Sequence, residues 1–186
     1  KVYLSRDIGP MSSKLLKYII HDFGPVEIII HYFGIGTGIA VPAGQSNMPG
    51  FENNFDYAQE LANYIQKNAG KMSLEKILYL APCAEERNVN AIWYEATKAA
   101  LTVLTKSVAD NLAATGINVN CVVPGLPEKT GLMKEEEGAK RTKNAARASN
   151  GVIVEENDFS EIVYFLISRK SQYLNGEVIT VSGRSI

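Results

Sequence analysis

The chain has 186 residues, of which 46% are hydrophobic and 21% charged, and its formal net charge is −1. These values are typical of one globular domain with a sizeable core, so we expect a single domain over residues 1–186. The balanced charge provides no basic face, which argues against a nucleic-acid partner. No run reaches membrane-spanning length and the first residues do not resemble a signal peptide. We therefore expect a cytoplasmic protein with no membrane association.

Cysteine and histidine are scarce. Cys83 and Cys121 are the only cysteines, and both lie at or near predicted strands, so two buried thiols are favoured over a disulfide. His21 and His31 are ten residues apart with no cysteine or carboxylate pattern nearby. The sequence therefore predicts no metal site.

The first part of the chain is predicted to form a strand, a helix and a second strand. Residues Val2 to Ser5 form a predicted short strand, and Ser12 or Ser13 can cap a helix that runs to about Asp22. Residues 26–32 are almost continuously apolar and predict a buried strand. Such a βαβ unit closes right-handed, with parallel strands. The helix residues expected to face inward are Leu15, Leu16, Ile19 and Ile20.

The next predicted elements continue this alternation. Asn53 or Asn54 can cap a helix that runs through about Lys67, and residues 76–80 predict the following strand. Three apolar residues of the helix share one face and are expected in the core: Leu61, Ala62 and Ile65.

A long predicted helix begins near Tyr94 and carries Lys98 four residues later. This spacing places both residues on one face, one turn apart. A tyrosine titrates near pH ~10, and a neighbouring positive charge lowers its pKa by favouring the phenolate. The pair is therefore a candidate for proton transfer.

The residues after this pair predict a helix, a turn and a buried strand. Four leucine and valine positions form an apolar stripe with helical period, and alanines leave a second face with little bulk. Gly116 suits a left-handed helix cap, and the strand that follows ends at Pro124-Gly125. The stripe consists of Leu101, Leu104, Val108 and Leu112, and the alanines are Ala96, Ala99 and Ala100.

Three features together resemble the second half of a classical short-chain dehydrogenase/reductase. They are the Tyr94-x-x-x-Lys98 pair, the strand that ends at Pro124-Gly125, and the segment 173–183. The resemblance implies an α/β doubly wound parallel sheet of the Rossmann type and chemistry with NAD(P). It also implies catalytic positions at Tyr94, Lys98 and Asn54. A simple helix cap is an equal alternative role for Asn54. Weaker cofactor-side positions would be Pro124, Gly125 and Thr130.

Several positions depart from the family pattern. The Gly-rich cofactor turn expected over residues 5–13 retains only Gly9, and His31-Tyr32-Phe33-Gly34 stands where the family has Asn-Asn-Ala-Gly. The sheet is expected to be shortened at its N-terminal, nucleotide-binding side, either by an internal deletion or because the chain begins at the family's third strand. The family's catalytic serine is replaced by Ala81, or by Pro82 with a one-residue slip. Losing one such donor typically lowers the rate by about 10²–10³.

These departures predict a degenerate, catalytically inactive subunit with a structural role in an oligomeric NAD(P)-dependent oxidoreductase, for example a hydroxyacyl-thioester dehydrogenase. No cofactor is then expected in this chain, although NAD(P) would bind in a partner subunit. The resemblance places the interface on helices 54–67 and 94–114, with a second copy or an active relative as partner. The main alternative is an active NAD(P)-dependent alcohol or ketone oxidoreductase that uses Tyr94 and Lys98. A cofactor-free lyase resembling the halohydrin dehalogenases and a ligand-sensing protein are further alternatives.

Overall fold

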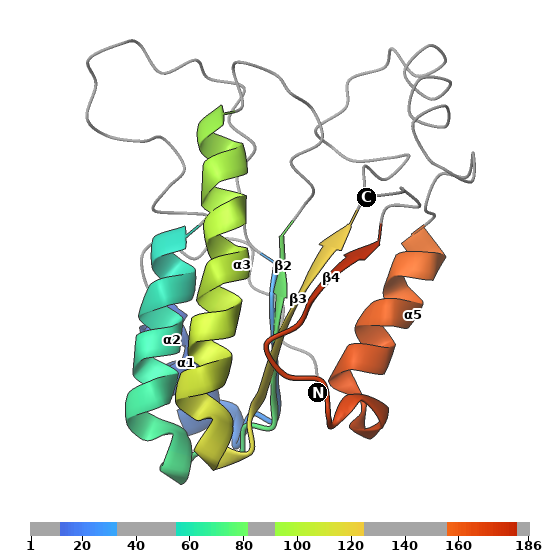
Figure 1. Ribbon diagram of the computed structural model, residues 1–186. Helices are drawn as coiled ribbons and strands as arrows, with labels where there is room; N and C mark the ends of the chain where they lie inside the picture. Colours follow the sequence, from blue (N-terminus) through green and yellow to red (C-terminus); the bar gives the residue numbers. More distant parts are fainter. Residues whose placement is uncertain (1–11, 33–54, 82–91, 125–155, 182–186) are drawn as a thin grey trace, which may run out of the picture.

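The centre of the protein is a parallel sheet of four strands in the order β1-β2-β3-β4 (Figure 1). The computed structural model describes residues 12–32, 55–81, 92–124 and 156–181. The strands are β1 Ile28–His31, β2 Lys76–Leu80, β3 Asn118–Pro124 and β4 Val178–Val181. Every neighbouring pair is parallel, so the carboxyl ends of all four strands lie at one edge of the sheet.

Helices cover both faces of this sheet (Figure 1). On one face lie α1 Ser12–Phe23, α2 Tyr57–Asn68 and α3 Ile92–Leu112, and on the other lies α5 Glu156–Ile167. Alternate residues of β2 show the two layers, because Ile77 and Tyr79 pack in the cluster with α1–α3, whereas Leu78 and Leu80 pack with α5. The predicted α/β, Rossmann-like class is confirmed. Three short 3-10 helices complete the described part: η2 Ala69–Lys71, η4 Ala113–Thr115 and η5 Arg169–Ser171.

The crossover connections between neighbouring strands do not all have the same handedness. The strands advance in one direction from β1 to β4, and α2 and α3 lie on the same face of the sheet. Parallel crossovers are right-handed in about 98% of cases. Since α5 lies on the opposite face while the strand order advances the same way, the connection from β3 through α5 to β4 has the opposite hand.

The first two helices agree with most of the sequence expectations. Helix α1 matches the predicted range, but of its predicted inward residues only Leu16 is fully buried, and Leu15 and Ile19 are half-buried. The regular part of α2 starts at Tyr57, and Phe55 and Asp56 before it are already helical, whereas the predicted caps Asn53 and Asn54 lie outside the described residues. Its N-cap residue is Asp56, whose backbone is already helical and whose side chain makes no capping hydrogen bond. The predicted inward residues of α2 are buried: Leu61, Ala62 and Ile65.

Strand β1 is shorter than the predicted strand 26–32. Val26 packs against the core without joining the ladder. The carbonyl of Glu27 accepts hydrogen bonds from the backbone N–H groups of Glu75 and Lys76, at 2.8 and 3.2 Å. Residue Glu27 is therefore hydrogen-bonded to the start of β2 just before the regular pairing of β1 with β2 begins.

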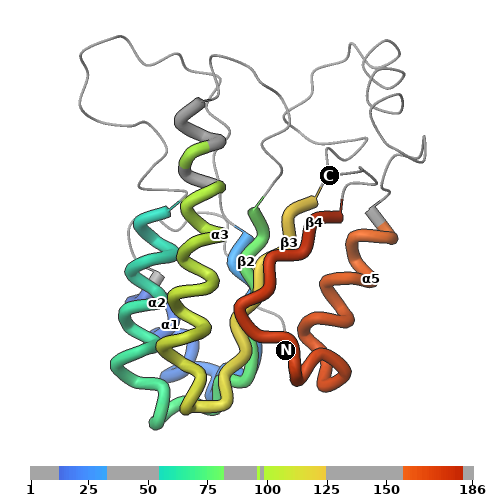
Figure 2. Tube along the Cα trace, in the orientation of Figure 1, coloured from blue at the N-terminus to red at the C-terminus, as the bar shows by residue number. Residues whose placement is uncertain are grey.

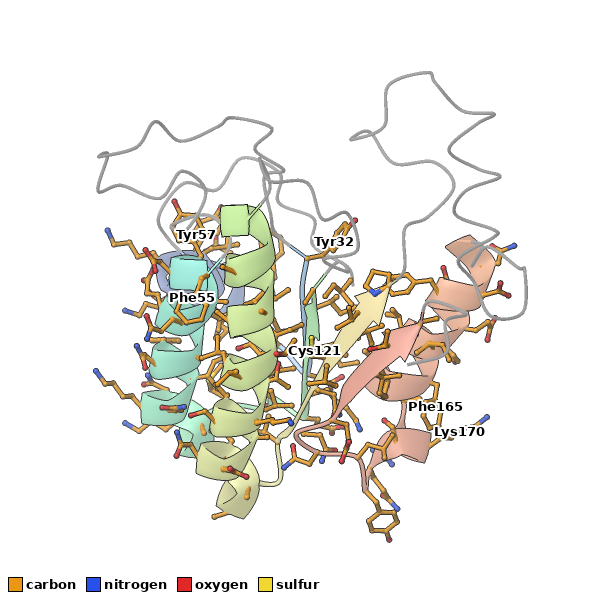
Figure 3. All side chains as sticks on the ribbon, turned by 45° about the horizontal axis from the view of Figure 1, so that its top comes forward. Tyr32, Phe55, Tyr57, Cys121, Phe165 and Lys170 are labelled. Carbon is orange, nitrogen blue, oxygen red and sulfur yellow. The ribbon has the colours of Figure 1, made fainter. Side chains whose placement is uncertain are left out.

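The long helix and the strand after it agree with the sequence prediction. Leu101, Val108 and Leu112 are buried, and Leu104 packs against the same cluster. Gly116 has a φ of +79° and ends the segment in the left-handed conformation that glycine adopts without strain. Cys121 is buried in β3, between the sheet and the helices (Figure 3).

Several predicted features lie outside the described residues. These are the strand Val2–Ser5, the caps Asn53 and Asn54, and the positions Pro82, Cys83, Gly125 and Thr130. Within the described ranges, no helix combines the length and apolar character needed to cross a bilayer.

Candidate active site

The edge formed by the strand carboxyl ends is also where α3 begins (Figure 2). Tyr94 and Lys98 both lie in α3, one helical turn apart, as the sequence predicts. Their side chains lie outside the described part of the structure. The helix therefore supplies the backbone arrangement for a tyrosine–lysine pair at the edge where open α/β sheets bind ligands.

Ala81 directly follows β2 at this edge. It is 1% exposed, and its backbone N–H donates to the carbonyl of Val122 at 2.9 Å. The backbone is thus held by the neighbouring strand, and the side chain is a methyl group with no hydrogen to donate. Ala81 is the first of the two positions that the family resemblance gives for the serine, and its side chain offers no donor to a substrate oxygen. The other, Pro82, lies outside the described residues.

Pro124 is the last residue of β3 and pairs in register with Val181 of β4. Proline has no backbone N–H, so it cannot donate a hydrogen bond at the strand end. The other predicted site residues cannot be placed beside it, because Asn54, Gly125 and Thr130 lie outside the described ranges. The structure therefore brings Ala81, Pro124 and the start of α3 to one edge.

A buried His31–Tyr79 contact lies near the same edge and was not predicted from the sequence. The two residues are cross-strand partners, with ring centroids 5.6 Å apart at 62°. Tyr79 is also the cross-strand partner of Cys121. The hydroxyl of Tyr79 is buried and has no hydrogen-bond partner within the described ranges. The only sequence signal for this His31–Tyr79 contact was that Tyr79 is the single aromatic residue of the buried strand β2.

Burial raises the pKa of the Tyr79 hydroxyl above its ordinary value, and the nearby Cys121 adds to this effect. Replacing Tyr79 with Phe removes an unsatisfied buried hydroxyl, so we expect the free energy of unfolding at pH 7 to rise by about 1 kcal/mol. Because the folded protein keeps a proton that the unfolded chain releases above pH ~10, wild-type stability falls there by up to about 1.4 kcal/mol per pH unit. Tyr79→Phe avoids this loss.

Urea denaturation of both proteins at pH 7 and at alkaline pH measures the two effects. The difference between variant and wild type should widen as the pH rises. Tyr32→Phe is the matched control, because it removes the same hydroxyl group from a residue that is 70% exposed. A difference that stays constant with pH would show that Tyr79 does not titrate differently in the folded protein.

Asparagine side chains form hydrogen bonds between β3 and the turn before β4. Asn120, 2% exposed, donates to the carbonyl of Leu174 at 2.9 Å and accepts from the backbone N–H of Glu177 at 3.0 Å. Asn175 accepts from the N–H of Val119 at 2.8 Å. Gly176 has a φ of +78°, and an added Cβ would lie 3.4 Å from the Cβ of Ala109. These bonds fix the register of β4, and hence its end at the candidate site.

A second buried polar group lies at the opposite, amino-terminal edge of the sheet. The ammonium of Lys76 donates to Asn118 Oδ1 and Ser171 Oγ, both at 3.1 Å. Burial lowers the pKa of this lysine. Ser171 in turn donates to the carbonyl of Leu166 at 2.7 Å. Since it lies at the far end of the strands, this network supports the packing of α5 and has no part in the candidate site.

A short-chain type dehydrogenase/reductase from Mycobacterium ulcerans superimposes with a TM-score of 0.78 at 21% identity, covering 92% of this chain and 64% of that chain. The model of a family described as Enoyl-(Acyl carrier protein) reductase matches residues 11–183. The chain belongs to the short-chain dehydrogenase/reductase family.

Several relatives of this short-chain dehydrogenase/reductase are reductases by name. The 3-oxoacyl-(acyl-carrier-protein) reductase FabG of Staphylococcus aureus strain N315 is 37% identical over 180 residues, covering 91% of this chain and 70% of the relative. FabG of Vibrio cholerae is 27% identical over 172 residues, with 91% and 70% coverage. The chloroplastic NADPH-dependent aldehyde reductase 2 of Arabidopsis thaliana is 33% identical over 133 residues, or 69% of this chain and 46% of the relative.

A solved variant of actinorhodin polyketide ketoreductase, crystallised with NADPH, has a TM-score of 0.77 at 22% identity and covers 94% of this chain and 72% of that chain. That ketoreductase was crystallised with NADPH, and the aldehyde reductase is named as dependent on it. Within the described ranges, the residues at the carboxyl edge of this sheet do not offer a donor set for such a cofactor. Ala81 presents a methyl group, Pro124 lacks an N–H, and the His31 ring packs on Tyr79.

Proposed function

We propose that this chain is a degenerate, catalytically inactive short-chain dehydrogenase/reductase subunit with a structural role in an oligomeric NAD(P)-dependent oxidoreductase. The observation that carries the proposal is Ala81. It sits buried at the carboxyl end of β2, where the family resemblance requires a serine hydroxyl. A methyl group cannot donate a hydrogen bond, so the substrate carbonyl is no longer polarised by a serine hydroxyl. Proton transfer from Tyr94 to a carbonyl oxygen that is less polarised is slower.

The names of the relatives support an acyl-thioester substrate for the complete oligomer. Several are 3-oxoacyl-(acyl-carrier-protein) reductases, and the aldehyde reductase relative is named as NADPH-dependent. We therefore place this subunit in a hydroxyacyl-thioester dehydrogenase or ketoreductase, with NAD(P) held by an active partner subunit. The cytoplasmic location expected from the sequence stays a prediction.

Helix α3 supports the oligomeric part of the proposal. Ala96, Ala99 and Val103 follow one another at helical spacing, and all three are exposed, Val103 by 69%. Small and apolar side chains permit the close approach of another helix. We propose that this row, together with α2, contacts a second copy or an active family relative, as the predicted helices 54–67 and 94–114 suggest.

The proposal predicts that the purified chain does not oxidise NADPH in the presence of a 3-oxoacyl thioester. Wild type and Tyr94→Phe should show the same background rate, because a proton donor without a polarised carbonyl contributes nothing. The Staphylococcus aureus reductase, assayed in parallel, serves as the positive control. Mass spectrometry of the intact native complex then identifies the partner subunit.

The active alternative rests on one observation, the presence of positions 94 and 98 one turn apart at the start of α3. It requires measurable turnover by wild type and a loss of about 10²-fold or more in Tyr94→Phe. That result would overturn the proposal of an inactive subunit.

A further inference from the structure

The turn before β4 contains an Asn-Gly pair, Asn175-Gly176, that has no role in the candidate site. Asparagine is one of the chemically labile residues, and a glycine after it leaves the next backbone nitrogen unshielded because glycine has no Cβ. In such a pair, this nitrogen can attack the side-chain amide carbon of the asparagine. The chain has a second Asn-Gly pair, Asn150-Gly151, which lies outside the described residues.

In the folded protein, both reacting groups are hydrogen-bonded to the backbone of Val119 in β3. The N–H of Gly176 donates to the carbonyl of Val119 at 2.7 Å, and the N–H of Val119 donates to Asn175 Oδ1 at 2.8 Å. Asn175 Nδ2 donates to the carbonyl of Ala109 at 3.5 Å. The reaction requires the Gly176 nitrogen to release its proton and the Asn175 amide to rotate onto it. These bonds must therefore break first.

The turn is also packed against its surroundings on both sides of the pair, between β3 and α3 (Figure 1). A Cβ added to Gly176 would lie 3.4 Å from the Cβ of Ala109 in α3. The N–H of the following residue, Glu177, donates to Asn120 Oδ1 at 3.0 Å. Asn175 and Gly176 are nevertheless only half-buried, so water reaches them once the turn separates from β3.

We propose that Asn175-Gly176 is a deamidation site whose reaction requires the turn before β4 to separate from β3. In the separated turn, the Gly176 nitrogen forms a bond to Cγ of Asn175 and the Cγ–Nδ2 bond breaks. Nδ2 leaves as ammonia, together with the proton from the Gly176 nitrogen. The product is a succinimide ring. Water then cleaves one or the other C–N bond of this ring, which gives aspartate or isoaspartate at position 175.

Isoaspartate prevents the turn from returning to β3. Its main chain runs through the former side-chain carboxyl group, which adds one carbon atom to the backbone before Gly176. The bonds from Gly176 to Val119 and from Glu177 to Asn120 then cannot form together. Aspartate keeps the normal main chain and an acceptor for Val119, so it permits the turn to pair again. Formation of isoaspartate therefore converts a transient opening of β4 into a lasting loss of its pairing with β3.

Peptide mapping of the full chain after incubation at neutral pH tests the proposal. Mass spectrometry with isoaspartate detection measures the rate of modification at position 175. The folded chain should react about tenfold or more slowly than the same chain unfolded in urea, because only the opened fraction reacts. Asn120→Ala removes the acceptor for the Glu177 N–H and should accelerate the reaction about tenfold or more. Asn118→Ala, on the same strand, should change the rate by no more than about threefold.

Two further measurements do not require Asn120→Ala to fold. In low concentrations of urea, the wild-type modification rate should rise in step with the hydrogen-exchange rate of the β4 amides, Val178–Val181. In the purified isoaspartate fraction, these amides should exchange about tenfold or more faster than in the unmodified protein. Asn175→Asp, which reproduces the aspartate product alone, should exchange like wild type.

Three results would overturn the inference. The first is equal modification of the folded and the urea-unfolded chain. The second is a rate in low urea that does not follow exchange of the β4 amides, or equal acceleration by Asn120→Ala and Asn118→Ala. The third is wild-type exchange of these amides in the isoaspartate fraction. Since no readout involves a cofactor, a substrate or a partner subunit, failure of this inference leaves the proposed function unaffected.

Discussion

Asn120→Ala should lower the free energy of unfolding by about 3 kcal/mol. The substitution removes the acceptor for the Glu177 N–H and the donor to the Leu174 carbonyl, and it does so at a site that is 2% exposed. Water cannot readily replace either bond. Urea denaturation followed by far-ultraviolet circular dichroism measures the loss, and hydrogen exchange should show it spreading through β4.

Asn118→Ala is the matched control on the same strand. Asn118 is only half-buried and accepts one side-chain bond, from Lys76 at 3.1 Å, which also has Ser171 as a partner. We expect its loss to cost about 1 kcal/mol. Equal destabilisation by the two variants would mean that the turn before β4 does not depend on Asn120.

Val103→Glu should weaken subunit association by about 100-fold or more without unfolding the chain. Val103 is 69% exposed in the isolated subunit, so the change should alter the free energy of unfolding by no more than about 0.5 kcal/mol. In an interface formed by α3, the same carboxylate would be buried without a partner. Sedimentation of the native complex over a range of concentrations measures the change.

Tyr173→Glu provides the control, because Tyr173 is 90% exposed and follows η5 on the other side of the sheet from α3. It adds the same charge and should leave association through α3 unchanged. If both variants associate like wild type, helix α3 is not the interface. If both dissociate, added charge rather than the α3 surface controls assembly.

Local signals made much of the fold predictable. The residue range of β2 matches the prediction because the short apolar run from Ile77 to Leu80, preceded by Glu75-Lys76 and followed closely by Pro82, favours a buried strand. The stripe from Leu101 to Leu112 fixed the inward face of α3, and Gly116 marked its end. Predictions at element boundaries were weaker. Strand β1 covers Ile28–His31 rather than the predicted range 26–32, because the carbonyl of Glu27 is already hydrogen-bonded to the residues at the start of β2.

The sequence by itself determined the α/β class and the family, since both depend on residue type and spacing within one segment. It also predicts that Ala81, or Pro82 with a one-residue slip, stands in place of the family's serine. Only the tertiary structure showed that His31 packs on Tyr79, that Asn120 fastens the turn before β4, and that β1 leaves Ile28 and Ile30 exposed. Such contacts join residues far apart in the chain. They are set by strand order and register, which residue patterns within a single segment do not specify.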